Sequence, residues 1–383
     1  MNRDLKIALV QDALPFIGGA EKLLEAVLEM FPEAPIFTLF YNPEAFKGSI
    51  IRRHSVQPSF INRLPGAKRG YRNYLPLFPL AIEQFDLSSF DVILSFSYAA
   101  AHGVLAVPGQ RHISFTYTPL RQAWHQYHQF VDSRGLKFGF ASWPKRVMLH
   151  YLRLWDLAAS QRVDQFAAVS HWVAGLIWRA YRRSAQVIYP PVDVQNFQPL
   201  EPRDNYYICV SRLARRKKLE LLVAAFTRLG LPFILVGEGP EDKRLRRLAG
   251  PNIRIPGWQP DRIVQQLLGR ARAFVHVAEE EFGIAMVEAQ AAGCPVIAYG
   301  KGGAAETVVD GQTGLLFNEQ SVESVMSAVE KFEFGALKFA VSDLRRNAER
   351  FNKKRFQQET LRLVMGEASV FENQEFAYSQ NML

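Results

Sequence analysis

Short apolar runs typical of buried β-strands alternate with helix-like segments along the whole chain. Residues 5–10 form the first run, Gly18 and Gly19 follow it, and apolar side chains recur with helical spacing over residues 20–31. A strand, a glycine loop and a helix in this order are typical of a doubly wound α/β domain, in which helices cover both faces of a parallel sheet. The pattern therefore predicts an α/β fold built on parallel sheets.

The alternation is interrupted once, at Pro190 and Pro191. Two adjacent prolines suit neither a helix interior nor a central strand, so they favour a link between domains. We expect one Rossmann-like domain over residues 1–190 and a second over residues 191–351. A C-terminal helix at about 352–375 is expected to pack back on the first domain. A chain of 383 residues is long enough to bury two cores of ordinary size.

The expected strands of the first domain are residues 5–10, 36–40, 91–96, 112–117, 165–169 and 186–189. Those of the second are residues 206–210, 233–236, 253–255, 273–277 and 295–298, with helices at 218–229, 240–249, 261–269 and 284–292. Ligands of open α/β sheets bind outside the carboxyl ends of the strands, so two such domains predict a ligand cleft between them.

The net charge of +9 is concentrated in residues 1–190, which carry 21 Lys and Arg against 13 Asp and Glu. A basic surface attracts nucleic acid, anionic membrane or acidic ligands, or is simply solvated. Nucleic acid is disfavoured, because no recognised binding module accompanies the charge. We recognise neither a spanning helix nor a signal peptide and expect a cytoplasmic protein. Cys209 and Cys294 lie in apolar runs and are expected to be core residues.

Two glutamates, Glu280 and Glu288, bracket a segment that follows an expected strand and opens an expected helix. Gly283 lets a ligand approach the backbone, and the free N–H groups of Ile284 and Ala285 at a helix start favour a phosphate. The carboxylates can accept hydrogen bonds from sugar hydroxyls. On these residues alone, two solvated carboxylates that balance the helix dipole are an equally good interpretation.

Cations and glycines precede expected helices at two further places. Arg212 and Lys217 follow the first expected strand of the second domain. Gly18 and Gly19 would place backbone N–H groups at a helix start that faces the cleft. Alone, the cationic run at 215–218 is typical of a solvated surface, and a Gly-Gly loop is a weak signal.

The segment EEFGIAMVEAQAAGCPVIA at 280–298 resembles the signature of family 4 of retaining glycosyltransferases, also called glycosyltransferase group 1, which have the two-domain GT-B fold. Further similar segments are SRLARRK at 211–217, GGAEK at 18–22, VGEGP at 236–240, GGAAETVVDGQTGLLF at 302–317 and RLWDLAASQRVDQFAAVS at 153–170. The resemblance covers most of the chain and is most specific in the C-terminal half.

The resemblance implies roles for individual residues. Glu280 would contact the hydroxyls of the donor sugar, Glu288 would bind the ribose, and Arg212 and Lys217 would bind the diphosphate of a nucleotide diphosphate-sugar. Lys218 stands where the family often has glycine. The implied donor-binding residues are Gly18, Gly19, Ser211, Arg212, Lys217, Trp258, Glu280, Phe282, Gly283, Ile284 and Glu288. The implied catalytic residues are Glu280, Arg212, Lys217 and His102.

The acceptor side departs from the family's common pattern. A His and a Lys usually stand at the places of Tyr98 and His102, and the polar residues around Tyr117 and over residues 121–125 are also exchanged. We expect Tyr98, His102 and Tyr117 to form the acceptor site, with His102 in contact with the donor hexose or an acceptor hydroxyl. A core or surface histidine is the alternative.

No aspartate has another aspartate two positions away, so the Asp-x-Asp pair of metal-dependent transferases is absent. The resemblance therefore implies retaining hexosyl transfer without a metal or other cofactor, in which the leaving phosphate takes the acceptor proton. A nucleotide-sugar epimerase of GT-B fold and a non-catalytic donor-binding protein are the alternatives. A dehydrogenase is disfavoured, because the loop at Gly18 and Gly19 is not a Gly-x-Gly-x-x-Gly fingerprint.

A UDP-sugar such as UDP-glucose is favoured as donor over GDP-mannose, with the base read near residues 254–258. The implied acceptor is a saccharide or lipid-linked saccharide used in polysaccharide biosynthesis. One segment interleaves cations with large apolar groups, which predicts peripheral contact with the anionic inner face of a membrane. The alternative is that its aromatics pack and its cations are solvated. The segment comprises Lys137, Phe138, Phe140, Trp143, Lys145, Arg146 and Arg153.

Overall fold

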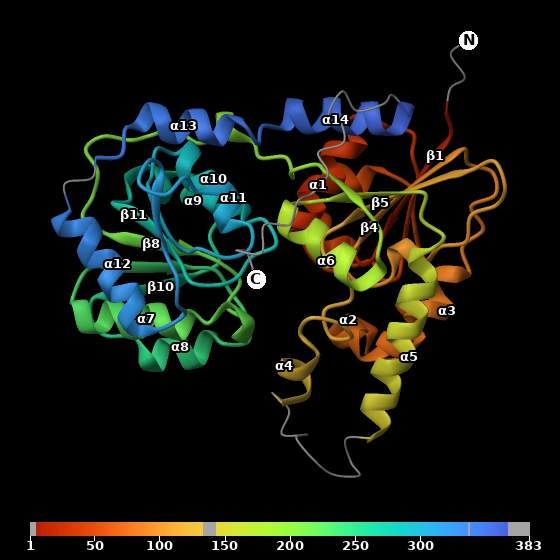
Figure 1. Ribbon diagram of the computed structural model, residues 1–383, viewed down its shortest axis with the longest axis horizontal. Coiled ribbons are helices and arrows are strands. Elements are labelled where there is room, and N and C mark those ends of the chain that lie inside the picture. Colours follow the sequence, from red (N-terminus) through yellow and green to blue (C-terminus); the bar gives the residue numbers. More distant parts are fainter. Residues whose placement is uncertain (1–4, 133–142, 336–337, 367–383) are drawn as a thin grey trace.

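The computed structural model of the chain describes residues 5–132, 143–335 and 338–366. It contains two parallel sheets in two lobes, each sheet flanked by helices (Figure 1). The predicted fold class, two doubly wound α/β units, is confirmed.

The first sheet has the strand order β3-β2-β1-β4-β5-β6-β7, and its neighbouring strands are parallel. The order reverses between β1 and β4, which is where ligands of such sheets bind. The strands are β1 Ile7–Gln11, β2 Ile36–Thr38, β3 Val56–Pro58, β4 Val92–Ser97, β5 Arg111–Thr116, β6 Gln165–Ala168 and β7 Ala185–Val187.

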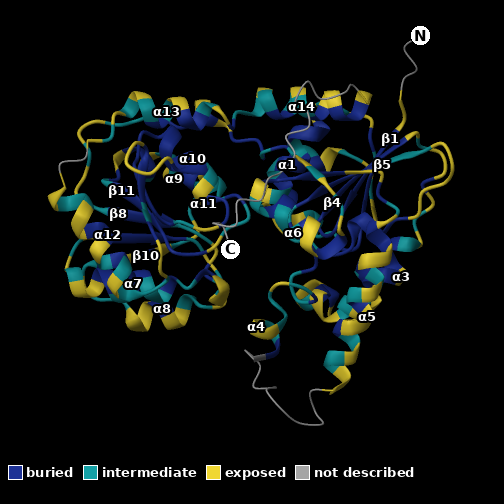
Figure 2. Cartoon of the chain, viewed as in Figure 1, coloured by how far each residue is buried: buried dark blue, intermediate teal, exposed yellow. Residues whose placement is uncertain are grey.

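The second sheet has the order β10-β9-β8-β11-β12-β13, again with parallel neighbours, and reverses between β8 and β11. Its strands are β8 Tyr207–Val210, β9 Phe233–Val236, β10 Ile253–Gly257, β11 Ala273–His276, β12 Val296–Tyr299 and β13 Gly314–Phe317. The central strands are buried along their whole length because helices cover both faces (Figure 2).

The α-helices of the first lobe are α1 Gly19–Leu28, α2 Ala67–Gly70, α3 Phe78–Glu83, α4 Tyr127–Asp132, α5 Trp143–Ser160 and α6 His171–Tyr181. Those that follow β8 are α7 Leu219–Leu229, α8 Asp242–Leu248, α9 Asp261–Arg270, α10 Ile284–Ala291, α11 Ala304–Thr307, α12 Val322–Phe334, α13 Val341–Glu349 and α14 Lys353–Met365. Short 3-10 turns are η1 Pro43–Phe46, η2 Ile50–Arg53, η3 Phe60–Arg63, η4 Tyr71–Leu77, η5 Ala101–Gly103, η7 Val194–Asn196 and η8 Arg215–Lys217.

Each sheet is packed by helices on two faces. On the first sheet α1, α6 and α14 share one core, and α3 and α5 contribute to the other. On the second sheet α9, α10 and α13 cover one face, and α7, α8 and α12 cover the other. Cys209 in β8 and Cys294 just before β12 are free and buried, as predicted for core residues.

The chain passes between the lobes twice, and the two crossings lie side by side. One follows β7 through Pro190 and Pro191, and the other joins α13 to α14. The N–H of Val192 donates to the carbonyl of Phe351 at 2.9 Å. Helix α14 then packs on the first lobe, where Phe356 is fully buried beside Phe115. The domain boundary at 190 stays a prediction, and its C-terminal helix beyond residue 366 lies outside the described residues.

Most predicted strands lie within two residues of the observed ones, but two strands were missed. Strand β3 is a short edge strand with exposed residues and a proline, so it has no apolar run. Strand β13 lies in a segment that we had interpreted only through its family resemblance. Within the described residues no helix is long and apolar enough to cross a membrane.

Candidate active site

A buried ion pair joins the loops that follow β8 and β11. Lys217 ends η8, and its Nζ donates to Oε1 of Glu280. Nε2 of His276, the last residue of β11, lies 2.8 Å from the same carboxylate oxygen. Although burial acts against the charged form, Lys217 and His276 hold the pKa of Glu280 well below its ordinary value. Glu280 is therefore an ionised hydrogen-bond acceptor between two loops.

The loop that carries Glu280 packs against the backbone of Gly302 and Gly303. The N–H of Gly303 donates to the carbonyl of Glu280 at 2.8 Å. A Cβ on Gly303 would lie 2.1 to 2.4 Å from backbone atoms of Phe282, so no larger residue fits without moving that loop. The glycines of the segment at 302–317 thus place Glu280 by close backbone contact.

The loop that carries Arg212 is positioned in the same way. Cβ atoms on Gly237 and Gly239 would lie 1.9 Å from the carbonyl oxygen of Ser211 and 2.3 Å from that of Leu213. The exposed guanidinium of Arg212 lies over the ring of Phe16 in the other lobe, 4.7 Å from its centre. Ser211 therefore contributes backbone geometry, and Arg212 projects toward the first lobe.

Lys218 adopts a left-handed backbone conformation, with φ of +49°. Glycine adopts this conformation without the steric cost that a side chain adds. The glycine that the family often has at this place therefore suits the turn, and the lysine found here keeps the same turn.

The motifs of the two lobes meet at the start of α10. A Cβ on Gly19 would lie 2.9 Å from Cδ1 of Ile284. Lys22 in α1 donates to Oε1 of Glu288 in α10 at 3.1 Å. Gly283 precedes the helix with φ of +93°, a conformation that favours glycine. The predicted Gly-Gly loop and the predicted ribose-binding glutamate are therefore neighbours.

The N–H of Gly18 is already engaged within its own helix start. It donates to Oε2 of Glu21 at 2.9 Å, which caps α1. Burial raises the pKa of the Glu21 carboxyl from 4.5 to about 7. Neither Glu21 nor Lys22 was among the predicted site residues.

Three further contacts between the lobes were missed by sequence reasoning. Arg121, in the loop after β5, forms an ion pair with Glu281 at 3.0 Å. The Oγ of Ser170 donates to the carbonyl of Glu281. The N–H groups of His171 and Trp172 at the start of α6 each donate to Glu306 at 2.8 Å. Arg121 and Ser170 lie in loops that follow parallel strands, and this position was the available signal. It could not identify their partners, which lie more than 100 residues away in the sequence.

Asp12 organises the loop that carries the predicted acceptor residues. This buried carboxylate follows β1 and accepts four backbone N–H groups at 2.5 to 2.7 Å. These belong to residues 98–101, directly after β4. The hydroxyl of Tyr98 lies 3.5 Å from that of Tyr71, and Tyr117 donates to the carbonyl of Ala20 at 3.0 Å. Tyr98 and Tyr117 thus lie beside α1, on the side of the lobe that meets α10.

His102, the predicted catalytic and acceptor residue, is buried and only 2% exposed. Its Nδ1 lies 2.9 Å from the Oγ of Ser97, and its Nε2 lies 3.3 Å from Oδ1 of Asp156. The ring also packs near Trp155 and Tyr181. These contacts fit the alternative of a core histidine, and the predicted role of His102 in catalysis or acceptor binding stays a prediction.

Two predicted donor-binding aromatics occupy different environments. Phe282 is buried between Tyr189 and Phe351, so its side chain supports the crossing between the lobes. Trp258 follows Gly257 at the end of β10 and is 64% exposed. The side chain of Trp258 is therefore accessible to a ligand and that of Phe282 is not, and the donor-binding roles of both stay predictions.

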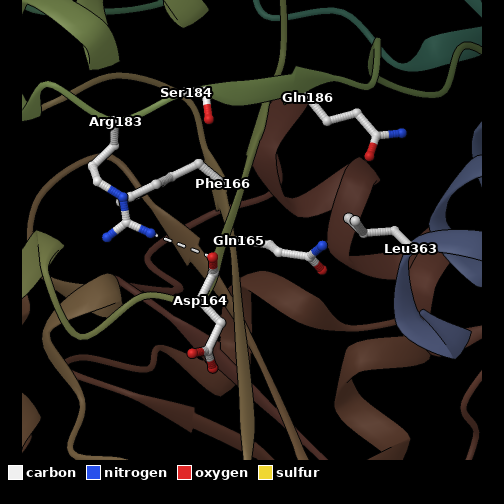
Figure 3. Close-up of a pocket in the computed structure, with 7 residues that line it drawn as sticks. All are labelled: Asp164, Gln165, Phe166, Arg183, Ser184, Gln186 and Leu363. Carbon is white, nitrogen blue, oxygen red and sulfur yellow. Dashed lines mark hydrogen bonds between the residues drawn. The ribbon is translucent and has the colours of Figure 1, made fainter. Parts of the chain in front are cut away.

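The pocket in Figure 3 lies at a different place. It is lined by residues around the amino ends of β6 and β7, whereas the site described above is at carboxyl ends. Its cation, Arg183, donates to the carbonyls of Val163 and Asp164 and lies over Phe166. Those contacts satisfy the guanidinium, so this pocket is not the active site.

Within the described ranges no group of three or more His, Cys, Asp or Glu could hold a metal ion. The metal-independence of the reaction and the roles of the individual site residues stay predictions.

Residues 193–355 match the family model described as glycosyl transferases group 1. Over this range the chain is similar to the group 1 glycosyl transferases. The predicted resemblance is thus confirmed for the half that carries Lys217, Glu280 and Glu288.

Curated relatives match over a limited part of their length. A GDP-mannose-dependent α-(1-6)-phosphatidylinositol monomannoside mannosyltransferase of Mycobacterium tuberculosis is 31% identical over 198 residues, which is 43% of this chain and 51% of the relative. A D-inositol 3-phosphate glycosyltransferase of Rhodococcus jostii is 28% identical over 198 residues, or 43% of this chain and 44% of the relative. The chain spans about half the length of the curated relatives it matches.

Solved structures are similar over nearly the whole chain. Anabaena HepE in complex with UDP and glucose has a TM-score of 0.69 at 17% identity, covering 94% of this chain and 99% of that one. Sucrose-phosphate synthase from Thermosynechococcus elongatus has a TM-score of 0.72 at 17% identity, covering 94% and 98%. At this identity the likeness concerns the fold alone, and it confirms the predicted GT-B fold.

Proposed function

We propose that the protein is a retaining, metal-independent hexosyltransferase that uses a nucleotide diphosphate-sugar. The observation that carries the proposal is the cluster of Lys217, Glu280 and His276, which lies just before α10 and opposite the Gly-Gly loop of the first lobe. Such a cluster combines a fixed cation with an ionised acceptor, the two groups that a sugar diphosphate requires.

In the proposed reaction the acceptor oxygen forms a bond to the anomeric carbon of the sugar as the bond from that carbon to the diphosphate breaks. Arg212 and Lys217 offset the charge that develops on the diphosphate. Glu280 holds the sugar hydroxyls, and the departing phosphate oxygen takes the proton of the acceptor hydroxyl. Because the acceptor enters from the face the diphosphate leaves, the anomeric configuration is retained.

The donor is proposed as a hexose on UDP or GDP. The sequence favours UDP-glucose, whereas the printed name of the Mycobacterium tuberculosis relative contains GDP-mannose. Anabaena HepE, with the same fold, was solved with UDP and glucose. The proposed acceptor is a saccharide or a lipid-linked saccharide.

We expect the purified protein to hydrolyse either labelled UDP-glucose or labelled GDP-mannose slowly in the absence of acceptor, and EDTA to leave that rate unchanged. NMR of the released sugar at early times is expected to give the configuration of the donor. A changed sugar still attached to nucleotide would identify an epimerase, and a bound but intact donor would identify a binding protein. A strict need for manganese or magnesium would contradict the metal-free reaction.

Helix α5 supports a proposed membrane contact, in a different form from the one predicted. Arg153 lies over the ring of Tyr127 at 5.1 Å and donates to Ala123, and Lys145 lies over Phe130 at 4.9 Å, so these cations turn toward the protein. The apolar side chains face outward instead. Exposed along α5 are Trp143, Val147, Tyr151, Leu154 and Leu157. Lys137, Phe138 and Phe140 lie outside the described residues.

Because the exposed stripe recurs every three to four residues, it forms one apolar helix face that can enter a headgroup layer. We expect the protein to sediment with anionic vesicles, and Leu154→Asp to reduce the bound fraction about threefold or more. Leu248→Asp, at an exposed leucine of α8, is the matched control and should bind as wild type does. Protein that stays in the supernatant with both anionic and neutral vesicles would exclude this contact.

A further inference from the structure

An exposed arginine of the first lobe has tyrosine hydroxyls beside it and forms no ion pair within 4.0 Å among the described residues, although the charge of Glu21 acts on it from further away. Nε of Arg72, in η4, donates to the hydroxyl of Tyr71 at 3.2 Å, and the guanidinium lies 5.5 Å from the centre of that ring. Among the described residues no carboxylate oxygen lies within 4.0 Å of Arg72. By contrast, Arg121 in the same lobe is neutralised by Glu281.

The position of Arg72 is fixed by an aromatic stack. The ring of Tyr71 is buried and stacks on Phe40 at 5.0 Å and on Phe78 at 6.5 Å, nearly parallel to both. Its hydroxyl also lies 3.5 Å from that of Tyr98, whose backbone is held by Asp12. A guanidinium is therefore held beside the Tyr71 and Tyr98 hydroxyl pair, which uses one O–H within the pair and leaves the other to donate.

The arginine also acts on the donor side. Partial burial, and next the repulsion from Arg72, lower the pKa of Arg212. The two cations therefore repel each other, and a bound anion near either of them relieves that repulsion. The surrounding segment at 59–77 adds Arg63, Lys68 and Arg69 and contains no Asp or Glu, so its field favours an anion.

We propose that Arg72, with the hydroxyls of Tyr71 and Tyr98, binds a phosphate group of the acceptor, so that the acceptor is a phosphorylated saccharide or a phosphate-linked lipid saccharide. This inference rests on the proposed function and adds the substrate class of its acceptor. The donor diphosphate is assigned to Arg212 and Lys217, and Arg72, whose partner Tyr71 adjoins Tyr98, is assigned to the acceptor phosphate.

The test uses protein saturated with UDP or GDP, whichever binds, and titrates inorganic phosphate by calorimetry. We expect Arg72→Gln to weaken phosphate binding about tenfold or more, since a charge-assisted bidentate contact is lost. Arg69→Gln removes the same charge from an exposed neighbour and should change phosphate affinity less than about twofold. Arg72→Gln is expected to leave nucleotide affinity within about twofold of wild type.

Two further arms identify the source of the phosphate. Binding of D-myo-inositol 3-phosphate, compared with myo-inositol, tests a soluble sugar phosphate; vesicles with phosphatidylinositol, compared with phosphatidylcholine alone, test a lipid. Dependence on Arg72 in either arm supports the proposal. Equal phosphate affinity in wild type and Arg72→Gln, or equal losses in Arg72→Gln and Arg69→Gln, would overturn it. Failure to bind any nucleoside diphosphate would instead overturn the proposed function.

Discussion

Replacing Lys217 with methionine, or Glu280 with alanine, is expected to reduce turnover about 100-fold or more. In the proposed reaction Lys217 supplies the cation that offsets charge on the departing diphosphate, and Glu280 supplies the carboxylate that orients the sugar. Both are held in place before any ligand binds, since Lys217 donates to Glu280 and His276 lies against the same oxygen. The measurement is the rate of donor hydrolysis or transfer at saturating donor.

The burial of this pair also predicts a cost in stability. The side chains are 9% and 13% exposed, and removing one partner leaves the other charge buried, which costs about 3 kcal/mol. The double variant Lys217→Met with Glu280→Gln removes both charges and should recover most of that loss while remaining inactive. Arg215→Met changes an exposed cation of the same turn and should keep activity. A folded single variant with near wild-type turnover would show that the donor site lies elsewhere.

Local sequence patterns were sufficient for the sheets because most strands are covered on both faces. The strand containing Cys209 reads as a continuous apolar run for that reason, and residues 233–236 were predicted without error. The edge strand at residues 56–58 has mostly exposed side chains, so its sequence lacks the apolar run by which a buried strand is recognised. A C-terminal helix that packs on the first domain was also expected, and Lys353–Met365 forms such a helix with its apolar side chains in the first core.

The candidate site was predictable where its chemistry is local and not where it depends on distant partners. Glu280 and Glu288 stand at a helix start, a place that favours anions, and the family resemblance separates them from ordinary surface carboxylates. His276 was missed because its role requires the loop that carries Glu280 to fold back over its own strand. The sequence left His102 open between a site residue and a core residue, because its buried neighbour Asp156 lies 54 residues further along the chain. Arg72 lies outside every recognised motif.

Replacing Glu21 with glutamine is expected to stabilise the protein at alkaline pH and to flatten its pH dependence. Glu21 is 6% exposed, and burial raises its pKa from 4.5 to about 7. The folded state therefore binds this proton more tightly than the unfolded state does. The stability that the proton contributes is complete below about pH 4.5 and is lost as the pH rises through 7. A shift of this size corresponds to about 3 kcal/mol.

Glutamine keeps an oxygen that can accept from the N–H of Gly18, so the cap of α1 is retained while the buried charge is removed. Urea unfolding at pH 5, 7 and 8.5 should give a free energy that falls more steeply for wild type than for Glu21→Gln, by up to about 3 kcal/mol across the range. Glu33→Gln alters an exposed carboxylate beyond the end of α1 and should follow wild type. Parallel curves for wild type and Glu21→Gln would mean that the carboxyl is not held protonated by burial, and that it faces the site as an ordinary anion.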